Sequence, residues 1–288
     1  MTAIDISAPA IEVPARTTSA RSRVRALVAA PGLAVSWLVI ATVLGWALVP
    51  SWFTDRSPLE GDSDVSFSPP SLDHPFGTDR LGRDLLARTI YGTSTTVSAT
   101  LLAVAFGFVI GSAIGLFSGF IGGRADSVIM RFVDVLLAIP GLLLAMTVVT
   151  ALGYGTMNIA VAVGISAVAA FARVMRSEVL KVAGTDYVEA AYGSGAGFGR
   201  VLVRHVLPNS VPAVISLAAL ECGAAVLAVA ALGFLGYGAP PPQPEWGLAV
   251  AEGRDFLATY PWISIMPGVL IAVVVLSTNR IGRALGDS

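Results

Sequence analysis

The sequence has few charged residues, two histidines and one cysteine. Only 13% of its 288 residues are Asp, Glu, Lys or Arg, whereas a soluble domain carries about 25%. The net charge is −1, and the basic residues are spread along the chain instead of gathering with aromatic residues. This pattern excludes nucleic acid as a main partner. Cys222 has no second cysteine to pair with, which excludes a disulfide framework and a zinc-type cysteine spacing.

Motifs for nucleotide binding and catalysis are also missing. No Gly-x4-Gly-Lys-Ser/Thr motif occurs, so we expect no P-loop. The alternating glycines of 193–199 do not have the Gly-x-Gly-x-x-Gly spacing, and no strand is predicted before them. His74 and His205 are far apart in sequence and have no nearby cysteine, which argues against a metal site. We therefore expect a protein that is not an enzyme and that holds no cofactor.

Apolar residues make up 55% of the chain. A helix needs about 20 apolar residues to cross the hydrocarbon core of a bilayer. The sequence predicts an all-α integral membrane protein with a tail at 1–30 and a six-span domain at 31–288. The predicted spans lie at 32–49, 96–121, 133–152, 157–174, 211–236 and 262–278.

The distribution of basic residues orients these spans. With the N-terminus inside, thirteen of the eighteen Lys and Arg residues fall in cytoplasmic segments and five in external ones. Cytoplasmic loops carry the excess of positive charge in membrane proteins. We predict cytoplasmic termini, external loops at 51–95 and 237–261, and a cytoplasmic loop at 175–210. Only one of the eighteen basic residues, Lys181, is a lysine, and this bias is typical of GC-rich bacterial genomes, so the expected location is the inner membrane of a bacterium, in contact with its lipid.

The second predicted span carries small residues at every fourth position, which places them on one helix face. Such stripes allow the backbones of helices in lipid to approach closely. We predict a packing face, and its partner is another helix of this chain or of a paired subunit. The stripe includes Gly107, Gly111, Gly115 and Gly119.

Two features within the spans suit a transport protein. Pro140 and Gly141 interrupt the third span, a break found in proteins that rock between states and also in static bundles. Glu221 lies within the fifth span, where a carboxylate is costly unless it faces protein or water. It is either a residue of a translocation pathway or a structural acid bonded to a neighbouring helix.

The cytoplasmic loop contains a predicted short helix at 186–192. Asp186 and Glu189 have the spacing of a capping box, and Gly193 or Gly195 is suited to a left-handed cap. Alanines at 190 and 191 would give the helix a flat face for another protein. We predict that Pro208 ends a second short helix before the fifth span. The alternative is an interfacial helix that links two spans and has no partner.

Three motifs follow one another along the chain. They are His74-Pro75-Phe76-Gly77-Thr78-Asp79-x2-Gly82-Arg83-Asp84, Glu189-Ala190-Ala191-x3-Gly195-x10-Val206-Leu207-Pro208-Asn209, and Phe234-Leu235-Gly236-Tyr237-Gly238 followed by a proline-rich stretch and Trp246-Gly247. Together they resemble the motifs of the second permease subunit of dipeptide and oligopeptide ABC importers. The resemblance covers residues from about 30 to the C-terminus. The chain departs from the family at Val229, near which such permeases often carry a Glu.

The resemblance implies a type I ABC importer permease fold, like that of the methionine importer. It implies four kinds of partner: a homologous second permease, one or two cytoplasmic ATPase subunits, an extracytoplasmic substrate-binding protein and a peptide substrate. It also makes the loop helix a coupling helix that docks on the ATPase. The residues implied in this coupling are Asp186, Tyr187, Glu189, Ala190, Ala191, Gly195, Leu207 and Pro208.

Two other functions remain open at this point. Permeases of the same group also take nickel or haem-like compounds, and the sequence does not specify the substrate. A secondary transporter driven by an ion gradient is the other alternative. It predicts internal repeats and matched ion-binding breaks, and the sequence has no clear repeat.

Overall fold

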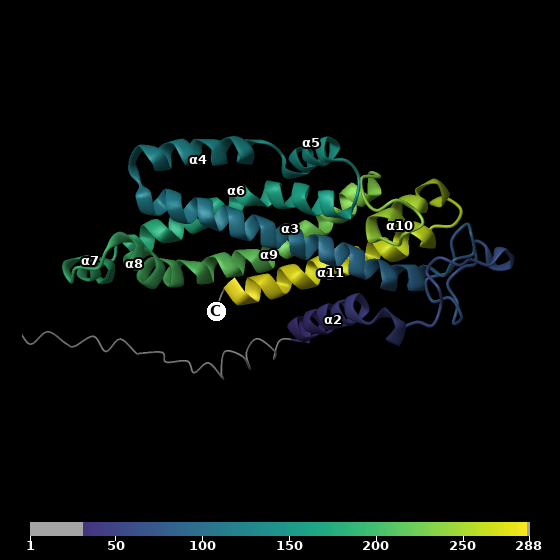
Figure 1. Ribbon diagram of the computed structural model, residues 1–288. Coiled ribbons are helices and arrows are strands. Elements are labelled where there is room, and N and C mark those ends of the chain that lie inside the picture. Colours follow the sequence, from purple (N-terminus) through teal and green to yellow (C-terminus); the bar gives the residue numbers. More distant parts are fainter. Residues whose placement is uncertain (1–30, 287–288) are drawn as a thin grey trace, which may run out of the picture.

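The fold is a bundle of long helices that run roughly side by side (Figure 1). The computed structural model describes residues 31–286, and these form helices and loops with one isolated bridge, between Thr78 and Asp84. The predicted tail 1–30 lies outside the described residues. One end of the bundle carries the short helices α7 (Asp186–Gly193) and α8 (Phe198–Val201), and the other carries α10 (Trp246–Glu252). We name them the α7 end and the α10 end.

Five helices among the described residues are long and apolar enough to cross a membrane. Large apolar side chains such as Leu38 and Leu276 are about two-thirds exposed on their outer surface, which suits hydrocarbon and not water. These helices are α2 (Pro31–Leu48), α3 (Leu85–Ile121), α6 (Thr156–Ala183), α9 (Leu207–Phe234) and α11 (Trp262–Gly286).

A sixth apolar segment is broken in the middle. It consists of α4 (Gly123–Ala138) and α5 (Gly141–Leu152), whose axes differ by 95°. Pro140 explains the break, because proline offers no N–H donor and disfavours the helical conformation of the residue before it. Ile139 is accordingly extended, with φ −90° and ψ 128°. If this bent pair is one span, residues 31–286 contain six.

Several helices extend beyond the predicted spans, because apolar runs do not mark helix ends. α3 begins at Leu85, before the predicted span start at 96, since the Asp84 carboxylate accepts the N–H of Ala87 at 2.7 Å and caps the helix. The segment between α2 and α3 is therefore shorter than the predicted loop 51–95. α4 begins at Gly123, well before the predicted start at 133, and α6 continues to Ala183 instead of ending at 174. Both helices continue through polar residues beyond their apolar stretches.

The stripe of small residues on α3 packs against α6 of the same chain. A Cβ atom added at Gly111 would lie 2.4 Å from the carbonyl oxygen of Val168, and one at Gly115 would lie 2.3 Å from that of Ala172. At Gly107 and Gly119 the nearest atoms belong to side chains of α6, at 2.9 and 3.0 Å. The two backbones are therefore in direct contact, which only glycine permits.

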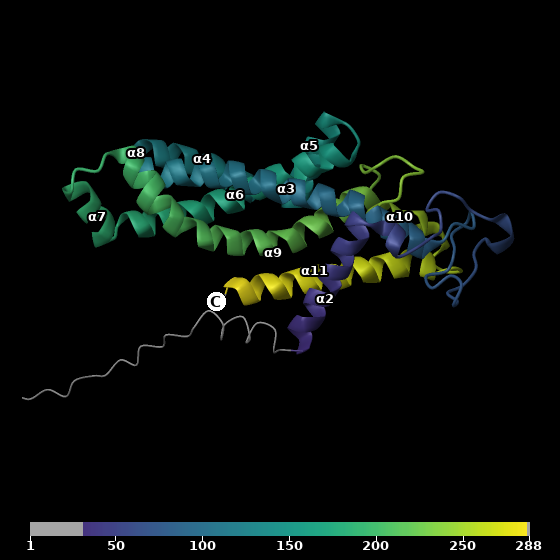
Figure 2. The same ribbon diagram turned by 60° about the horizontal axis from the view of Figure 1, so that its bottom comes forward.

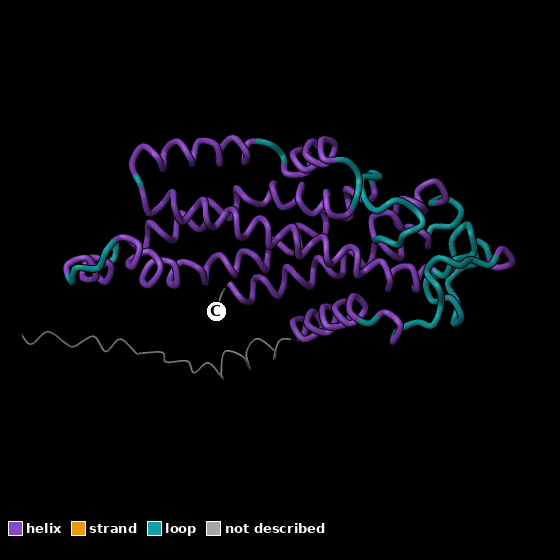
Figure 3. The backbone as a smooth tube through the Cα atoms, in the orientation of Figure 1, coloured by secondary structure: helices purple, strands orange, loops and turns teal. Residues whose placement is uncertain are grey.

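The remaining elements close the bundle around this pair. α2 lies across α11 on the outside, and α9 packs between α11 and α6 (Figure 2). Most of the loop structure gathers at the α10 end, as Figure 3 shows. That end includes the segment between α2 and α3, with the short turns η1 (Pro50–Trp52) and η2 (Ser63–Val65), and η4 (Arg254–Phe256) after α10.

Candidate functional site

The segment between α6 and α9, residues 184–206, projects from one end of the bundle (Figure 1). We name it the α7 loop. Val188 anchors α7: it is 1% exposed and belongs to the same apolar cluster as Val179 of α6 and Val201 of α8. The ring of Phe198 packs on Phe120 at the end of α3, with centroids 4.3 Å apart. The α7 loop is thus fixed to the ends of two spans.

The caps of α7 differ in part from the prediction. The N-cap residue is Thr185, whose hydroxyl donates to the carbonyl of Val182, so Asp186 already lies inside the helix and the predicted capping box is absent. The predicted left-handed cap is present at Gly195, with φ +83°. The N–H groups of Gly195 and Ala196 donate to the carbonyls of Tyr192 and Ala191, which is the bond pattern of a Schellman motif.

One face of α7 is open to solvent. Asp186, Tyr187, Glu189 and Ala190 are exposed. Ala191, which we predicted to share this face, is half-buried and packs against the apolar cluster. The flat surface therefore centres on Ala190, and Ala191 supports it from beneath.

A hydrogen bond joins α7 to the start of the next span. The Tyr187 hydroxyl and His205 Nδ1 are bonded, and their rings meet edge to face with centroids 5.0 Å apart. His205 belongs to η3 (Leu202–Val206), one turn of π-helix between α8 and α9. His205 therefore joins α7 to the helical turn that leads into α9.

Pro208 does not end a helix, contrary to the prediction. It lies in the first turn of α9, and α8, η3 and α9 follow one another without a break. Proline cannot donate to the carbonyl four residues earlier, and the π-turn directly precedes it: the N–H of Leu207 reaches back to the carbonyl of Leu202. Leu207 itself packs half-buried on the apolar cluster.

Two ion pairs join α4 to α6, and the sequence analysis missed both. The carboxylate of Asp126 accepts hydrogen bonds from Nε and Nη2 of Arg176, each at 2.6 Å. It also accepts one from the hydroxyl of Ser118 on α3. Asp134 receives Nη2 of Arg173. These pairs could not be predicted from neighbouring residues in the sequence, because the acids and the arginines lie on different helices. Which acid meets which arginine depends on how the two antiparallel helices are aligned.

The α10 end holds a buried charge network built on the Thr78–Asp84 motif. Asp79 accepts the N–H groups of Leu81 and Arg83 at 2.8 and 3.0 Å and Nε of Arg83 at 2.6 Å. Arg88 of α3, whose side chain is 1% exposed, donates to Glu252 of α10 at 2.8 Å. Each buried charge has an opposite partner, as burial requires.

Asp84 links this network to the loop before α3. Its second oxygen lies 2.8 Å from Nδ1 of His74, and Nη1 of Arg56 lies 3.5 Å from that oxygen. His74 therefore holds the loop against the start of α3. Gly82, with φ +70°, forms the turn that brings Asp79 and Asp84 together.

Glu245, at the N-cap of α10, is 3% exposed. One carboxylate oxygen accepts the N–H of Gly247 at 3.1 Å, while the other is buried without a partner among the described residues. A Cβ atom at Gly238 of the third motif would lie 2.6 Å from this second oxygen, and one at Gly233, just before the motif, would lie 2.2 Å from it, so the carboxylate leaves no room for a side chain at either position. Burial raises the pKa of Glu245 from 4.5 to about 7, partly offset by the N–H groups of Gly247 and Leu248.

This raised pKa predicts a pH-dependent stability. Between about pH 4.5 and 7 the folded protein holds a proton on Glu245 that the unfolded chain has released, so stability falls as the pH rises through this window. The contribution is on the order of 3 kcal/mol. Glu245→Gln keeps the oxygen that accepts from Gly247 but cannot ionise. We expect the melting temperature of the wild-type protein to drop more between pH 5 and pH 8 than that of the variant, and equal drops would contradict this.

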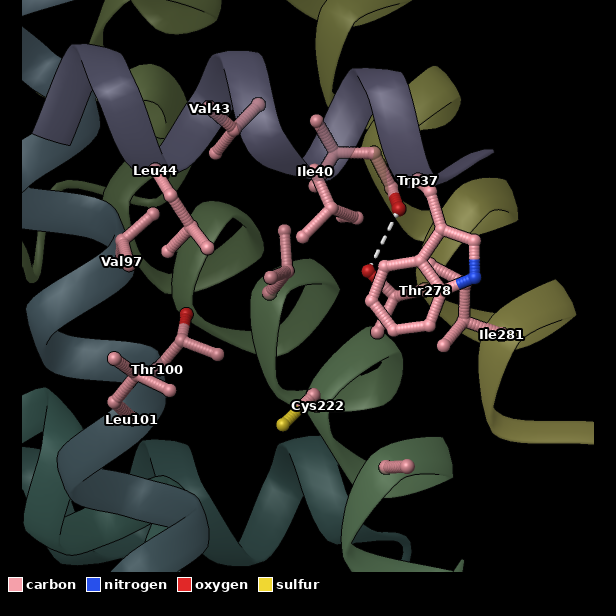
Figure 4. Close-up of a pocket in the computed structure, with 13 residues that line it drawn as sticks. Trp37, Ile40, Val43, Leu44, Val97, Thr100, Leu101, Cys222, Thr278 and Ile281 are labelled. Atoms are coloured by element: carbon pink, nitrogen blue, oxygen red, sulfur yellow. Dashed lines mark hydrogen bonds between the residues drawn. The ribbon is translucent and has the colours of Figure 1, made fainter. Parts of the chain in front are cut away.

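Glu221 is half-buried on α9 and takes part in no ion pair of residues 31–286. Its neighbour Cys222 lines an apolar pocket of about 280 Å³ between α2, α3, α9 and α11 (Figure 4). The hydroxyls of Thr100 and Thr278 in this pocket donate to carbonyls of their own helices, those of Thr96 and Val274. These two hydroxyls are thus already bonded, and most of the lining side chains are apolar.

The fold defines the class of protein. The chain superimposes on a chain of the inward-facing MetNI methionine ABC transporter with a TM-score of 0.54 at 21% identity, over 70% of this chain and 96% of that one. It also superimposes on a chain of an amino acid ABC transporter with a TM-score of 0.56 at 16% identity, over 70% and 94%. The fold is therefore that of the membrane-spanning subunit of a type I ABC importer, as the resemblance implies.

The family follows from the sequence comparisons. Residues 107–287 match the family described as binding-protein-dependent transport system inner membrane component, and the chain belongs to this family. It is thus a multi-pass inner-membrane permease component and not a catalytic subunit.

Similar curated proteins are peptide permeases by name. The dipeptide transport system permease protein DppC of Alkalihalophilus pseudofirmus is 37% identical over 88% of this chain and 84% of its own length. The probable D,D-dipeptide transport system permease protein DdpC of Escherichia coli is 37% identical over 89% and 86%. The glutathione transport system permease protein GsiD of Pectobacterium atrosepticum is 40% identical over 76% and 73%.

Proposed function

We propose that this chain is one permease subunit of an ATP-driven peptide importer. The observation that carries the proposal is the α7 loop, a projecting helix with an open face around Ala190 and a rigid connection through η3 into α9. The exposed acids Asp186 and Glu189 border this face. We assign it the docking of an ATPase subunit, which supplies the nucleotide site that the sequence lacks.

The assembly then contains a second permease, one or two ATPase subunits and an extracytoplasmic binding protein. The family description, with its reference to binding proteins, supports the last of these. The names of the similar proteins, which refer to dipeptides and glutathione, support a short peptide as substrate. The α7 end faces the cytoplasm, and the α10 end, with its folded loops, faces the binding protein.

The experiment is uptake by a reconstituted complex. The chain is co-expressed with a candidate second permease, ATPase subunit and binding protein from the same organism, purified through a tag on this chain and placed in liposomes. We expect an ATPase subunit to co-purify and a labelled dipeptide to enter only with ATP. Uptake driven by an ion gradient without ATP would overturn the proposal in favour of a secondary transporter, and uptake of nickel or haem alone would overturn the peptide assignment.

The proposed orientation gives a labelling prediction. Leu72, in the loop before α3, is fully exposed, and the side chain of Lys181, near the α7 end, is 76% exposed. In a chain whose Cys222 is replaced by Ala, we expect Leu72→Cys to react with a membrane-impermeant maleimide in spheroplasts. Lys181→Cys should react only after the membrane is opened. The reverse pattern would invert the orientation.

A further inference from the structure

An exposed ion pair joins α6 to α4, the first half of the broken segment. Arg173 of α6 donates through Nη2 to Asp134 of α4, and both side chains are more than half exposed, at 56% and 51%. At 1.5 Å per residue, Arg173 lies about 15 Å from the end of α6. The apolar stretch of α6 ends beside it, so the pair lies at the edge of the hydrocarbon core.

The neighbouring pair on the same two helices has a different environment. The side chains of Asp126 and Arg176 are 12% and 31% exposed, and Asp126 accepts three hydrogen bonds from two residues. Arg176 uses two of its donors on one carboxylate, which is the strong bidentate geometry. This pair is satisfied within the chain and holds α3, α4 and α6 together.

Arg173 and Asp134 are only partly satisfied. A guanidinium has five N–H donors, and among the described residues a single one, on Nη2, is bonded to Asp134. Asp134 receives no donor other than Arg173 within residues 31–286. Both groups therefore have hydrogen-bonding capacity available to a ligand.

The surroundings argue against contact with lipid. Charged side chains facing hydrocarbon are costly, and they occur at protein interfaces or beside water-filled paths. The break at Ile139 and Pro140 follows Asp134 on the same helix, and a broken helix is tolerated where it adjoins protein or a water-filled cavity. Arg131, one turn before Asp134, is exposed as well. Exposed charged side chains beside a helix break are the arrangement expected along a water-filled path.

We infer that Arg173 and Asp134 bind the charged termini of the peptide during its passage. The inference rests on the proposed function and specifies its substrate class as zwitterionic peptides with free ends. Arg173 binds the α-carboxylate through its paired donors, and Asp134 accepts hydrogen bonds from the α-ammonium group. In an extended dipeptide the two charged ends are about 7 Å apart. Rotation of the Arg173 and Asp134 side chains can separate their charged groups by this distance. When no peptide is present, the two groups neutralise each other.

The test compares peptides with free and blocked ends. Uptake by reconstituted complexes is measured at saturating binding protein for a dipeptide, its C-terminal amide and its N-acetyl form. We expect the wild-type complex to prefer the free dipeptide, and Arg173→Gln to lower its uptake about tenfold while leaving uptake of the amide little changed. Asp134→Asn should in the same way remove the preference over the N-acetyl form.

The buried pair provides the matched control. Arg176→Gln should reduce the yield of assembled complex but leave the preference among the three peptides unchanged. If Arg173→Gln does not assemble, Arg173→Lys keeps the charge without the bidentate geometry and should show a weaker preference for the free carboxylate. A variant at Arg173 with the wild-type preference would overturn the inference, because the binding protein alone would then select the termini. A wild-type complex that imports no peptide would instead overturn the proposed function.

Discussion

Replacing Gly111 with Ala should prevent this protein from assembling, although it adds only one methyl group. The new Cβ atom would lie 2.4 Å from the carbonyl oxygen of Val168 and 2.7 Å from the Cβ of Phe171. A backbone oxygen cannot move aside as a flexible side chain can, so α3 and α6 must separate. Overpacking costs typically 1–3 kcal/mol, and we expect the upper part of this range, because close backbone contact is what holds membrane helices together. The yield of purified complex from membranes measures the effect.

Gly268→Ala is the matched control for this substitution. Gly268 lies on the membrane helix α11 and has no atom within 4 Å of an added Cβ atom. Both variants change a helical glycine to alanine, so the change in helix propensity is the same. We expect a normal yield for Gly268→Ala, and normal yields for both would mean that α3 and α6 are farther apart than in this structure.

Ala190→Trp should abolish ATP-driven transport while the permease still inserts in the membrane. Ala190 lies on the exposed face of α7 that we assign to ATPase docking. A tryptophan there would hold the two proteins apart, and docking surfaces depend on close packing at their centre. We expect co-purification of the ATPase to fall about tenfold or more. Co-purification and peptide-stimulated ATP hydrolysis are the two measurements.

Gly193→Ala is the control on the same helix, since an added Cβ atom there has no neighbour within 4 Å and φ is not positive. Ala191→Trp would be a poorer test, because Ala191 packs inward and its replacement would also disturb the α7 loop. The docking assignment would be refuted by an Ala190→Trp complex that retains the ATPase and couples hydrolysis to uptake at the normal rate.

Sequence patterns predicted the features of this fold that depend on neighbours along the chain. Glycines four residues apart must share a helix face, so the packing stripe on α3 could be predicted, but not that α6 is its partner. Pro140 predicted the break between α4 and α5, because proline acts on its own backbone. The helix ends were predicted less well. The start of α3 is set by the side chain of Asp84, which caps the helix, and a pattern of apolar residues gives no information about such a cap.

The functional residues also divide into those that local sequence predicts and those that it does not. Gly195 could be predicted as a cap, because a left-handed residue after a short helix is a local requirement. The capping box failed since Thr185, one residue earlier, takes the N-cap position. Glu245 and the Asp134–Arg173 pair were missed because burial and pairing come from segments distant in the sequence. For Glu221 both predictions stay open, a residue of a translocation pathway or a structural acid.

The direct contact between α3 and α6 limits how the protein can change shape. No side chain stands between Gly111 or Gly115 and the facing carbonyls, so no rotamer change can accommodate sliding of one helix along the other. With 37 residues, α3 is about 55 Å long, and the pair forms a strut across the full bilayer. Changes of shape must then occur outside this helix pair, at two positions. One is Gly122, the sole residue between α3 and α4, and the other is the kink before Pro140. The spacing between α3 and α6 should be the same in every state of a transport cycle.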